Sequence, residues 1–145
     1  MNNLTQGLIA GFVATVVMSA MLLAKDMMGI MPELDIIAML TGMMNMGDAA
    51  SWVAHFVYGT VILGGLYAYF EPRIPGGSHW AKGSVLGVGA WLVMMIVVMP
   101  MAGAGLFGLT LGIMAPIMTL VVHIIFGAVL GGTFGALVSR KGVTA

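Results

Sequence analysis

Four uninterrupted apolar stretches, each close to the length needed to cross a bilayer, decide what this chain can fold into. A helix needs about 20 consecutive apolar residues to cross the hydrocarbon core. Irregular backbone exposed to lipid leaves its polar groups unsatisfied. We therefore predict an all-α, four-transmembrane-helix bundle, with the third helix ended by Pro100. The predicted spans are Gly7 to Leu23 with an extension toward Ile30, Ser51 to Phe70, Gly83 to Met99, and Ala115 to Val138.

The scarcity of charge supports this prediction. Charged residues make up 7% of the 145 residues, whereas soluble domains carry roughly a quarter. A water-facing surface cannot be assembled, so residues 1–145 are expected to form a single integral membrane domain in contact with the lipid bilayer. The absence of cysteine excludes disulfides and thiolate metal sites. The formal net charge is zero and there is no run of basic residues, so we predict no nucleic-acid partner. The N-terminal segment before the first apolar stretch has no Lys or Arg, which predicts a retained helix and not a cleaved signal peptide.

The few basic residues predict the orientation. Four of them fall on the side shared by both termini and the central connection: Arg73, Lys82, Arg140 and Lys141. The opposite side carries Lys25 alone, among several acids. Because basic loops stay in the cytoplasm, both termini are predicted to be cytoplasmic in a multi-pass protein.

Two connections and one loop histidine add detail to this topology. Acidic and apolar residues alternate at near-helical spacing from Pro32 to Leu40, which predicts a short interfacial helix after the first span. The glycine-rich segment from Gly103 to Met114 is expected to be a loop that dips back into the protein. His79 follows the turn residues from Pro75 to Ser78 and is expected to be a solvated loop residue.

The two halves of the chain resemble each other. Met31-Pro32 is followed 23 residues after the proline by His55, and Met99-Pro100 is followed by His123 at the same interval. We predict two parallel two-helix repeats, about 5–70 and about 83–139, related by a pseudo-two-fold axis along the membrane normal. This symmetry places His55 and His123 at similar depth in the outer leaflet.

The paired histidines carry the main functional hypotheses. One is a b-type haem ligated by His55 and His123, with Gly59 and Gly127 one turn later leaving room for the macrocycle. The other is copper(I), bound by the same histidines with the thioethers of Met43, Met44 and Met46. The alternative is structural: neutral imidazoles hydrogen-bonded across the bundle to groups such as Ser51, Thr60 or Thr119, and methionines that fill gaps.

No motif for catalysis is present. The sequence has no nucleophile with a base beside it, no phosphate-binding Gly-rich loop and no His-Glu-x-x-His helix. We expect a non-enzymatic membrane protein that binds copper(I) or haem in an outer-leaflet pocket and serves a respiratory or metal-handling system. The alternatives are a cofactor-free structural subunit, as a homo-oligomer or within a larger membrane complex, and a small channel or transporter.

Several segments are similar to one known family. The stretches Gly87 to Met95 and Met99 to Gly105, the pair His123 and Gly127, and the turn Pro75 to His79 resemble a family of small bacterial membrane proteins of unknown function. The resemblance implies four helices and a location in the bacterial inner membrane. It implies no activity and no site residues.

Overall fold

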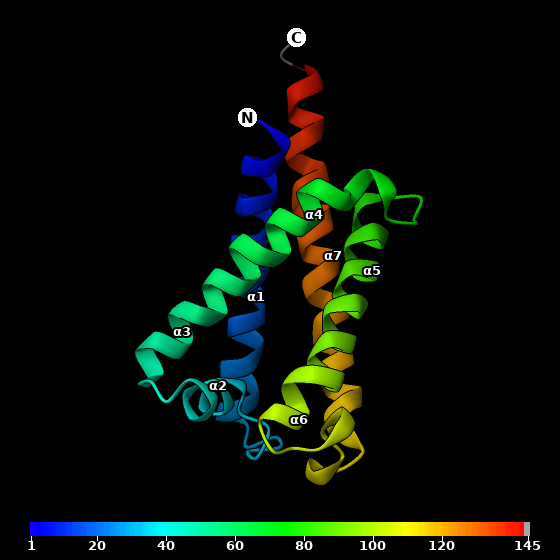
Figure 1. Cartoon of the computed structure of the whole chain (residues 1–145). Coiled ribbons are helices and arrows are strands. Elements are labelled where there is room, and N and C mark those ends of the chain that lie inside the picture. Colours follow the sequence, from blue (N-terminus) through cyan, green and yellow to red (C-terminus); the bar gives the residue numbers. More distant parts are fainter. Residues whose placement is uncertain (144–145) are drawn as a thin grey trace.

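The computed structural model describes residues 1–143, with side chains through Arg140, and is helical without any strand in that part of the chain (Figure 1). The helices are α1 (Asn3–Met27), α2 (Ile36–Met44), α3 (Asp48–Val57), η1 (Tyr58–Leu63), α4 (Gly64–Phe70), η2 (Glu71–Arg73), α5 (His79–Val93), η3 (Met94–Val98), α6 (Met99–Met101), η4 (Leu106–Leu111) and α7 (Met114–Val143). The side chain of Lys141 lies outside the described residues.

Consecutive elements join into four long apolar rods, which confirms the prediction of an all-α fold with four helices suited to cross a membrane. The rods are Asn3–Met27, Asp48–Arg73, His79–Met101 and Met114–Arg140. Only 17% to 39% of the most apolar window of each rod is buried inside the protein. The remaining apolar surface faces outward and is suited to contact with a lipid bilayer.

Local capping explains where several helices begin. Asn2 Oδ1 accepts a hydrogen bond from Thr5 N at 2.8 Å, so the first helix starts four residues before the predicted Gly7. Asp35 Oδ1 accepts from Ala38 N at 3.0 Å, which starts α2 four residues after the predicted Pro32.

Pro100 does not end the third rod, contrary to the prediction. The helix passes through the π-helical segment η3 and continues to Met101, with Pro100 in the first turn of α6, where its missing N–H costs little. Two residues after the helix ends at Met101, Gly103 has a φ of +80°, which allows Ala104 N to donate to Met99 O at 2.9 Å.

Glycines set the two closest helix contacts. On the first pair of rods, a Cβ at Gly64 would lie 2.5 Å from the Gly7 carbonyl oxygen, so α1 and α4 meet backbone to backbone. On the second pair, a Cβ at Gly127 would lie 2.6 Å from the Gly83 carbonyl carbon, so α5 and α7 meet in the same way. Such contacts replace the hydrophobic drive that lipid does not provide.

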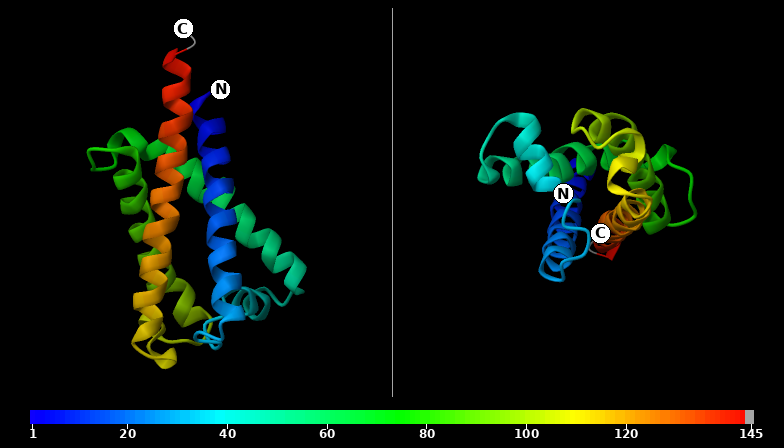
Figure 2. Two further views of the ribbon diagram at one scale, coloured as in Figure 1. Left: turned by 180° about the vertical axis from the view of Figure 1, so that it is seen from behind. Right: turned by 90° about the horizontal axis from the view of Figure 1, so that it is seen from below.

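The ends of the molecule differ in packing. The start of α1, the end of α7 and the α4–α5 connection lie at one end, called here the terminal end (Figures 1 and 2). There α1 packs on α7, and Tyr67 and Phe134 stack edge to face with centroids 5.2 Å apart in a core that also holds Ala10, Ala14 and Leu130. At the opposite end α3 leans away from the other rods, and α2 connects it to α1 (Figure 1).

A second, smaller core holds the connection before α7. Met95 and Met99 pack with Leu34, Ala104 and Ala115, all nearly inaccessible. This core fixes η4 against α6 and the start of α7, at the end opposite the termini.

The glycine seam predicts a sharp contrast between two positions of α5. Replacing Gly83 with Ala forces a Cβ into the backbone of α7, so we expect a loss of about 1–3 kcal/mol, typical of overpacking. Gly89 is exposed and has no atom near its missing Cβ, so Gly89→Ala should be neutral or gain up to about 1 kcal/mol. Thermal unfolding in detergent measures both, and equal effects would contradict the seam.

Candidate functional site

A cavity of about 820 Å³ occupies the half of the molecule farther from the termini, where α3 leans outward. Its walls come from the second half of α1, from α3 and η1, from η3, and from the first half of α7. Apolar side chains form nearly all of the lining. His55 and His123 both belong to it, so the structure brings these two predicted residues to one cavity.

The hydrogen bond of His123 fixes which of its nitrogens is available. The side chain is 7% exposed, and its Nδ1 lies 2.7 Å from the Thr119 carbonyl oxygen, one turn earlier on α7. A carbonyl oxygen only accepts, so Nδ1 carries the hydrogen. In the neutral ring Nε2 therefore holds an unshared electron pair.

His55 reaches the same state through a different partner. Its Nε2 lies 3.3 Å from Ser19 Oγ on α1. Ser19 Oγ already donates its single hydrogen to the Thr15 carbonyl oxygen at 2.8 Å. The imidazole must therefore donate from Nε2, which leaves the unshared pair of the neutral ring on Nδ1.

Of the partners suggested by the sequence, Thr119 is used, although through its carbonyl and not its hydroxyl. Ser51 instead bonds Thr41 at 2.8 Å, and the buried Thr60 Oγ1 has no partner in the described residues. Ser19 was not predicted, because it lies on another helix and no local spacing connects it to His55. The four-residue spacing from Thr119 to His123 was a usable local signal.

Two π-helical segments contribute to the cavity walls. η1 supplies Tyr58, Gly59 and Leu63 to the lining, and η3 supplies its first and last residues, Met94 and Val98. π turns are rare and occur often at functional sites, because they shift side chains out of the regular helical register. Nothing in the sequence indicated either segment.

The two predicted glycines lie in helix contacts. Gly59 lines the cavity, but its missing Cβ would meet the Thr15 hydroxyl, so it serves the approach of η1 to α1. Gly127 is outside the cavity, against Gly83 of α5. Neither glycine opens space beside its histidine for a macrocycle.

The structure does not bring the predicted methionines to the histidines. Met43 lines a separate depression with Glu33 and Asp35, and Met44 and Met46 are 39% and 48% exposed. The methionines that line the cavity are Met18, Met21, Met28, Met94, Met114 and Met118. Within the described residues, no group of three or more His, Asp or Glu side chains could hold a metal ion.

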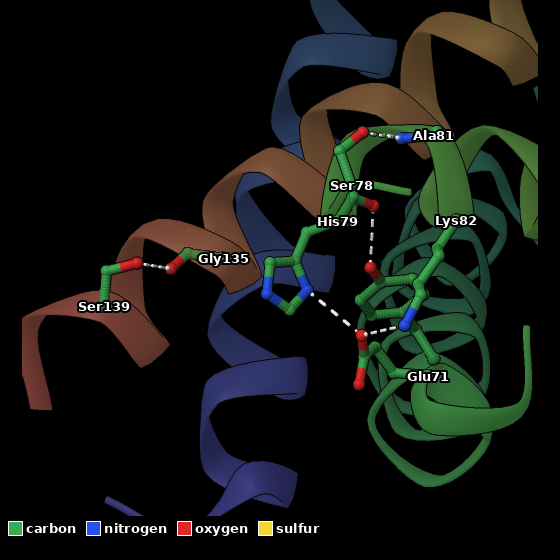
Figure 3. A network of polar contacts seen from close by, with 8 residues as sticks. Glu71, Ser78, His79, Ala81, Lys82, Gly135 and Ser139 are labelled. Carbon is green, nitrogen blue, oxygen red and sulfur yellow. Dashed lines mark hydrogen bonds and ion pairs between the residues drawn. The ribbon is translucent and has the colours of Figure 1, made fainter. Parts of the chain in front are cut away.

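A second polar cluster lies at the terminal end (Figure 3). Glu71 Oε1 accepts from Lys82 Nζ at 2.8 Å and lies 3.2 Å from His79 Nδ1, without the alignment of a hydrogen bond. Tyr67 OH donates to the His79 carbonyl oxygen at 2.8 Å. His79 is therefore not the solvated loop residue that was expected: it begins α5 and packs against Gly135. The cluster ties the α4–α5 connection to the bundle.

The cavity is thus the site with chemical capacity. Two nitrogens with unshared pairs, from two helices, belong to the lining of one apolar space. Such nitrogens can coordinate a metal centre or accept hydrogen bonds from a ligand.

The chain belongs to a family described as Family of unknown function (DUF6789), which matches residues 1–144. The predicted resemblance to a family without assigned function is confirmed to that extent. No curated protein and no solved structure shows detectable similarity to the chain.

The terminal-end cluster predicts a stability effect of Glu71. Glu71→Gln removes the charged acceptor from the partly buried Lys82, and we expect a loss of about 1.5–3 kcal/mol, the range for hydrogen bonds to charged groups. Glu33→Gln, at an exposed position, is the matched control and should change stability by less than about 0.5 kcal/mol. Thermal unfolding checks both, and an unaffected Glu71→Gln would contradict the structural role.

Proposed function

We propose that this chain is a non-enzymatic integral membrane protein and that it binds a small, largely apolar molecule in its cavity. Its family assigns it no activity, so the proposal is based on the cavity alone. One observation carries the proposal: two histidines, each with one nitrogen free to accept, line a single apolar cavity. Its volume of about 820 Å³ falls within the roughly 300–1,000 Å³ of small-molecule and cofactor sites.

The bilayer is the source of this molecule. Several lining residues are strongly accessible, among them Met28 at 66%, Met114 at 51% and Val121 at 50%, so the cavity is open and not enclosed. Because the long helices have apolar outer surfaces, we expect this opening to face lipid. An apolar ligand dissolved in the membrane enters without crossing water.

Of the two cofactors suggested by the sequence, haem is more compatible with the volume and apolar lining of the cavity, and two imidazoles line it. The predicted space beside each histidine is not there, because Gly59 and Gly127 lie in helix contacts. Copper(I) needs no cavity of this size, and Met43, Met44 and Met46 lie away from the histidines. A copper site would have to use methionines of the cavity wall such as Met18 and Met118.

In this proposed role the protein lies in the bacterial inner membrane with both termini in the cytoplasm and the cavity in the outer half. The side chains of Arg73, Lys82 and Arg140 belong to the terminal end, whereas Lys25 at the opposite end is paired with Asp26. α2 is the interfacial helix of this arrangement.

An internal duplication accounts for the two glycine seams. Each pair of rods, α1 with α4 and α5 with α7, meets through glycine backbone, and each pair carries its histidine on the second rod. The symmetry is incomplete, since α5 and the α3–α4 rod share no contact comparable to that of α1 and α7. The cavity lies where that contact between the rods would otherwise be.

Binding can be tested on protein extracted from bacterial membranes directly into polymer-bounded lipid discs. We expect a molecule other than bulk lipid to co-purify, detected by native mass spectrometry, with a Soret band if it is haem and copper by elemental analysis if it is the metal. His55→Ala and His123→Ala should lose it because they remove its polar partners. The exposed Met44→Ala should retain it. Wild-type protein without any retained molecule, and without thermal stabilisation by added haem or copper(I), would rule out the proposed function.

The orientation can be tested with reporters. A fluorescent protein fused after Ala145 should fluoresce, and alkaline phosphatase at the same place should be inactive, because the terminal end faces the cytoplasm. Insertion of the phosphatase at Gly47, in the α2–α3 connection where nothing lies near the missing Cβ, should give activity. The reverse pattern would overturn the orientation.

A further inference from the structure

The hydrogen-bond chemistry of the cavity wall narrows the class of ligand, on the premise that the proposed function holds. We infer that the ligand is neither haem nor a metal ion but an apolar molecule that brings hydroxyl hydrogens to the two histidines, of the type of an aromatic 1,4-diol with an alkyl or isoprenoid tail. Its oxidised 1,4-dione form should bind more weakly. The inference depends on which groups of the wall donate and which accept.

Both imidazoles offer acceptors. Their donor nitrogens are already used, His123 Nδ1 on the Thr119 carbonyl and His55 Nε2 on Ser19 Oγ. What remains in each neutral ring is an unshared pair, on His123 Nε2 and on His55 Nδ1. The His123 side chain is more than nine-tenths buried and lines the cavity, and its Nε2 has no partner within the described residues, so a ligand in the cavity can donate a hydrogen bond to it.

The hydroxyl groups around the cavity also have no hydrogen left to donate to a ligand. Thr15 Oγ1 donates to the Gly11 carbonyl oxygen at 2.7 Å, and Thr119 Oγ1 donates to the Ala115 carbonyl oxygen at 2.7 Å. Ser19 Oγ donates to the Thr15 carbonyl oxygen. Each hydroxyl has one hydrogen, so none of the three can donate to a ligand.

Two other donors line the cavity, Lys25 and Tyr58. The ammonium of Lys25 is held by Asp26 and by the Met31 carbonyl oxygen at 3.2 Å. A dione presents only acceptor oxygens, so it can accept from the Tyr58 hydroxyl but leaves His123 Nε2 and His55 Nδ1 without a donor. A diol supplies hydrogens to both imidazoles and can also accept from Tyr58.

The rest of the lining suits an aromatic ring and a tail. Phe126, Met94 and Met118 offer an aromatic edge and thioethers, which make favourable contacts with aromatic rings. Ile117 and Val121 on α7 line the cavity and are about half exposed, so a tail can continue past them into lipid.

The experiment compares three ligands that differ only in their oxygen substituents: 2-decylhydroquinone, 2-decyl-1,4-benzoquinone and 1,4-dimethoxy-2-decylbenzene. Binding is measured by calorimetry, without oxygen, to the protein in phosphatidylcholine nanodiscs, with empty nanodiscs subtracted. We expect the diol to bind at least about 10-fold more tightly than either of the others, the effect of one or more satisfied hydrogen bonds. Equal or tighter binding of the dione would overturn the inference.

Two variants separate the chemistry from simple loss of fold. His123→Phe keeps a ring of similar breadth and should reduce the affinity for the diol about 10-fold while leaving that of the dimethoxy compound nearly unchanged. Ser19→Ala removes the acceptor that fixes the His55 tautomer, so the preference for the diol over the dione should fall about 3-fold or more. Both variants are checked by thermal unfolding. A preference that Ser19→Ala leaves intact would contradict the role of the tautomer.

Failure of the inference and failure of the proposed function give different results. If all three compounds bind equally well, the cavity is a ligand site without hydroxyl preference, and the inference is wrong while the function stands. If none binds above empty nanodiscs, and haem and copper(I) neither bind nor stabilise the protein, the proposed function fails as well.

Discussion

The structure depends on close contact between helix backbones at glycine. In lipid an apolar helix gains nothing by exchanging acyl chains for other apolar side chains, so association rests on packing at short range. Gly7 against Gly64 and Gly83 against Gly127 bring the rods so close that no side chain fits between them. Where these seams end, the rods are free to diverge. The seam between α1 and the second rod ends near Gly59, and α3 beyond it leans away from the bundle.

The cavity is the result of that divergence. It opens between the two glycine-joined pairs of rods, beyond the ends of their seams. Its polar groups are satisfied mostly within their own helices, as in the bond from Thr119 Oγ1 to the Ala115 carbonyl. Only the two imidazoles keep a free nitrogen among these pairings. An apolar cavity with a few fixed acceptors favours ligands that carry hydrogen-bond donors over ligands that carry none, since a buried acceptor left unpaired is costly.

The sequence was enough to predict the four rods, but it was not enough to predict how the residues of the candidate site are arranged. Apolar length identified all four spans, because the hydrocarbon thickness imposes that length on any chain. The end of the third span was placed two residues early, since Pro100 is tolerated in a first helical turn after a π segment. The 23-residue interval singled out His55 and His123, which do line one cavity.

The partners of those histidines could not be predicted in the same way. Ser19 meets His55 only because α1 and α3 cross there, and that crossing is set by distant glycines. For the same reason Met18 and Met118 line the cavity while the more conspicuous Met43 and Met44 do not. Local spacing can suggest which residues share a helix face, but the angle between rods decides which faces meet.

α7 is longer than the membrane requires. Its 30 residues extend about 45 Å at 1.5 Å per residue, against a hydrocarbon core of about 30 Å. The surplus emerges at the terminal end beside the start of α1, beyond the α4–α5 connection (Figure 2). The same continuous helix carries His123 in the cavity and Arg140 at this end. A force on these last turns therefore acts on one continuous helix whose other half forms a wall of the cavity, and tilting that helix would change the shape of the space.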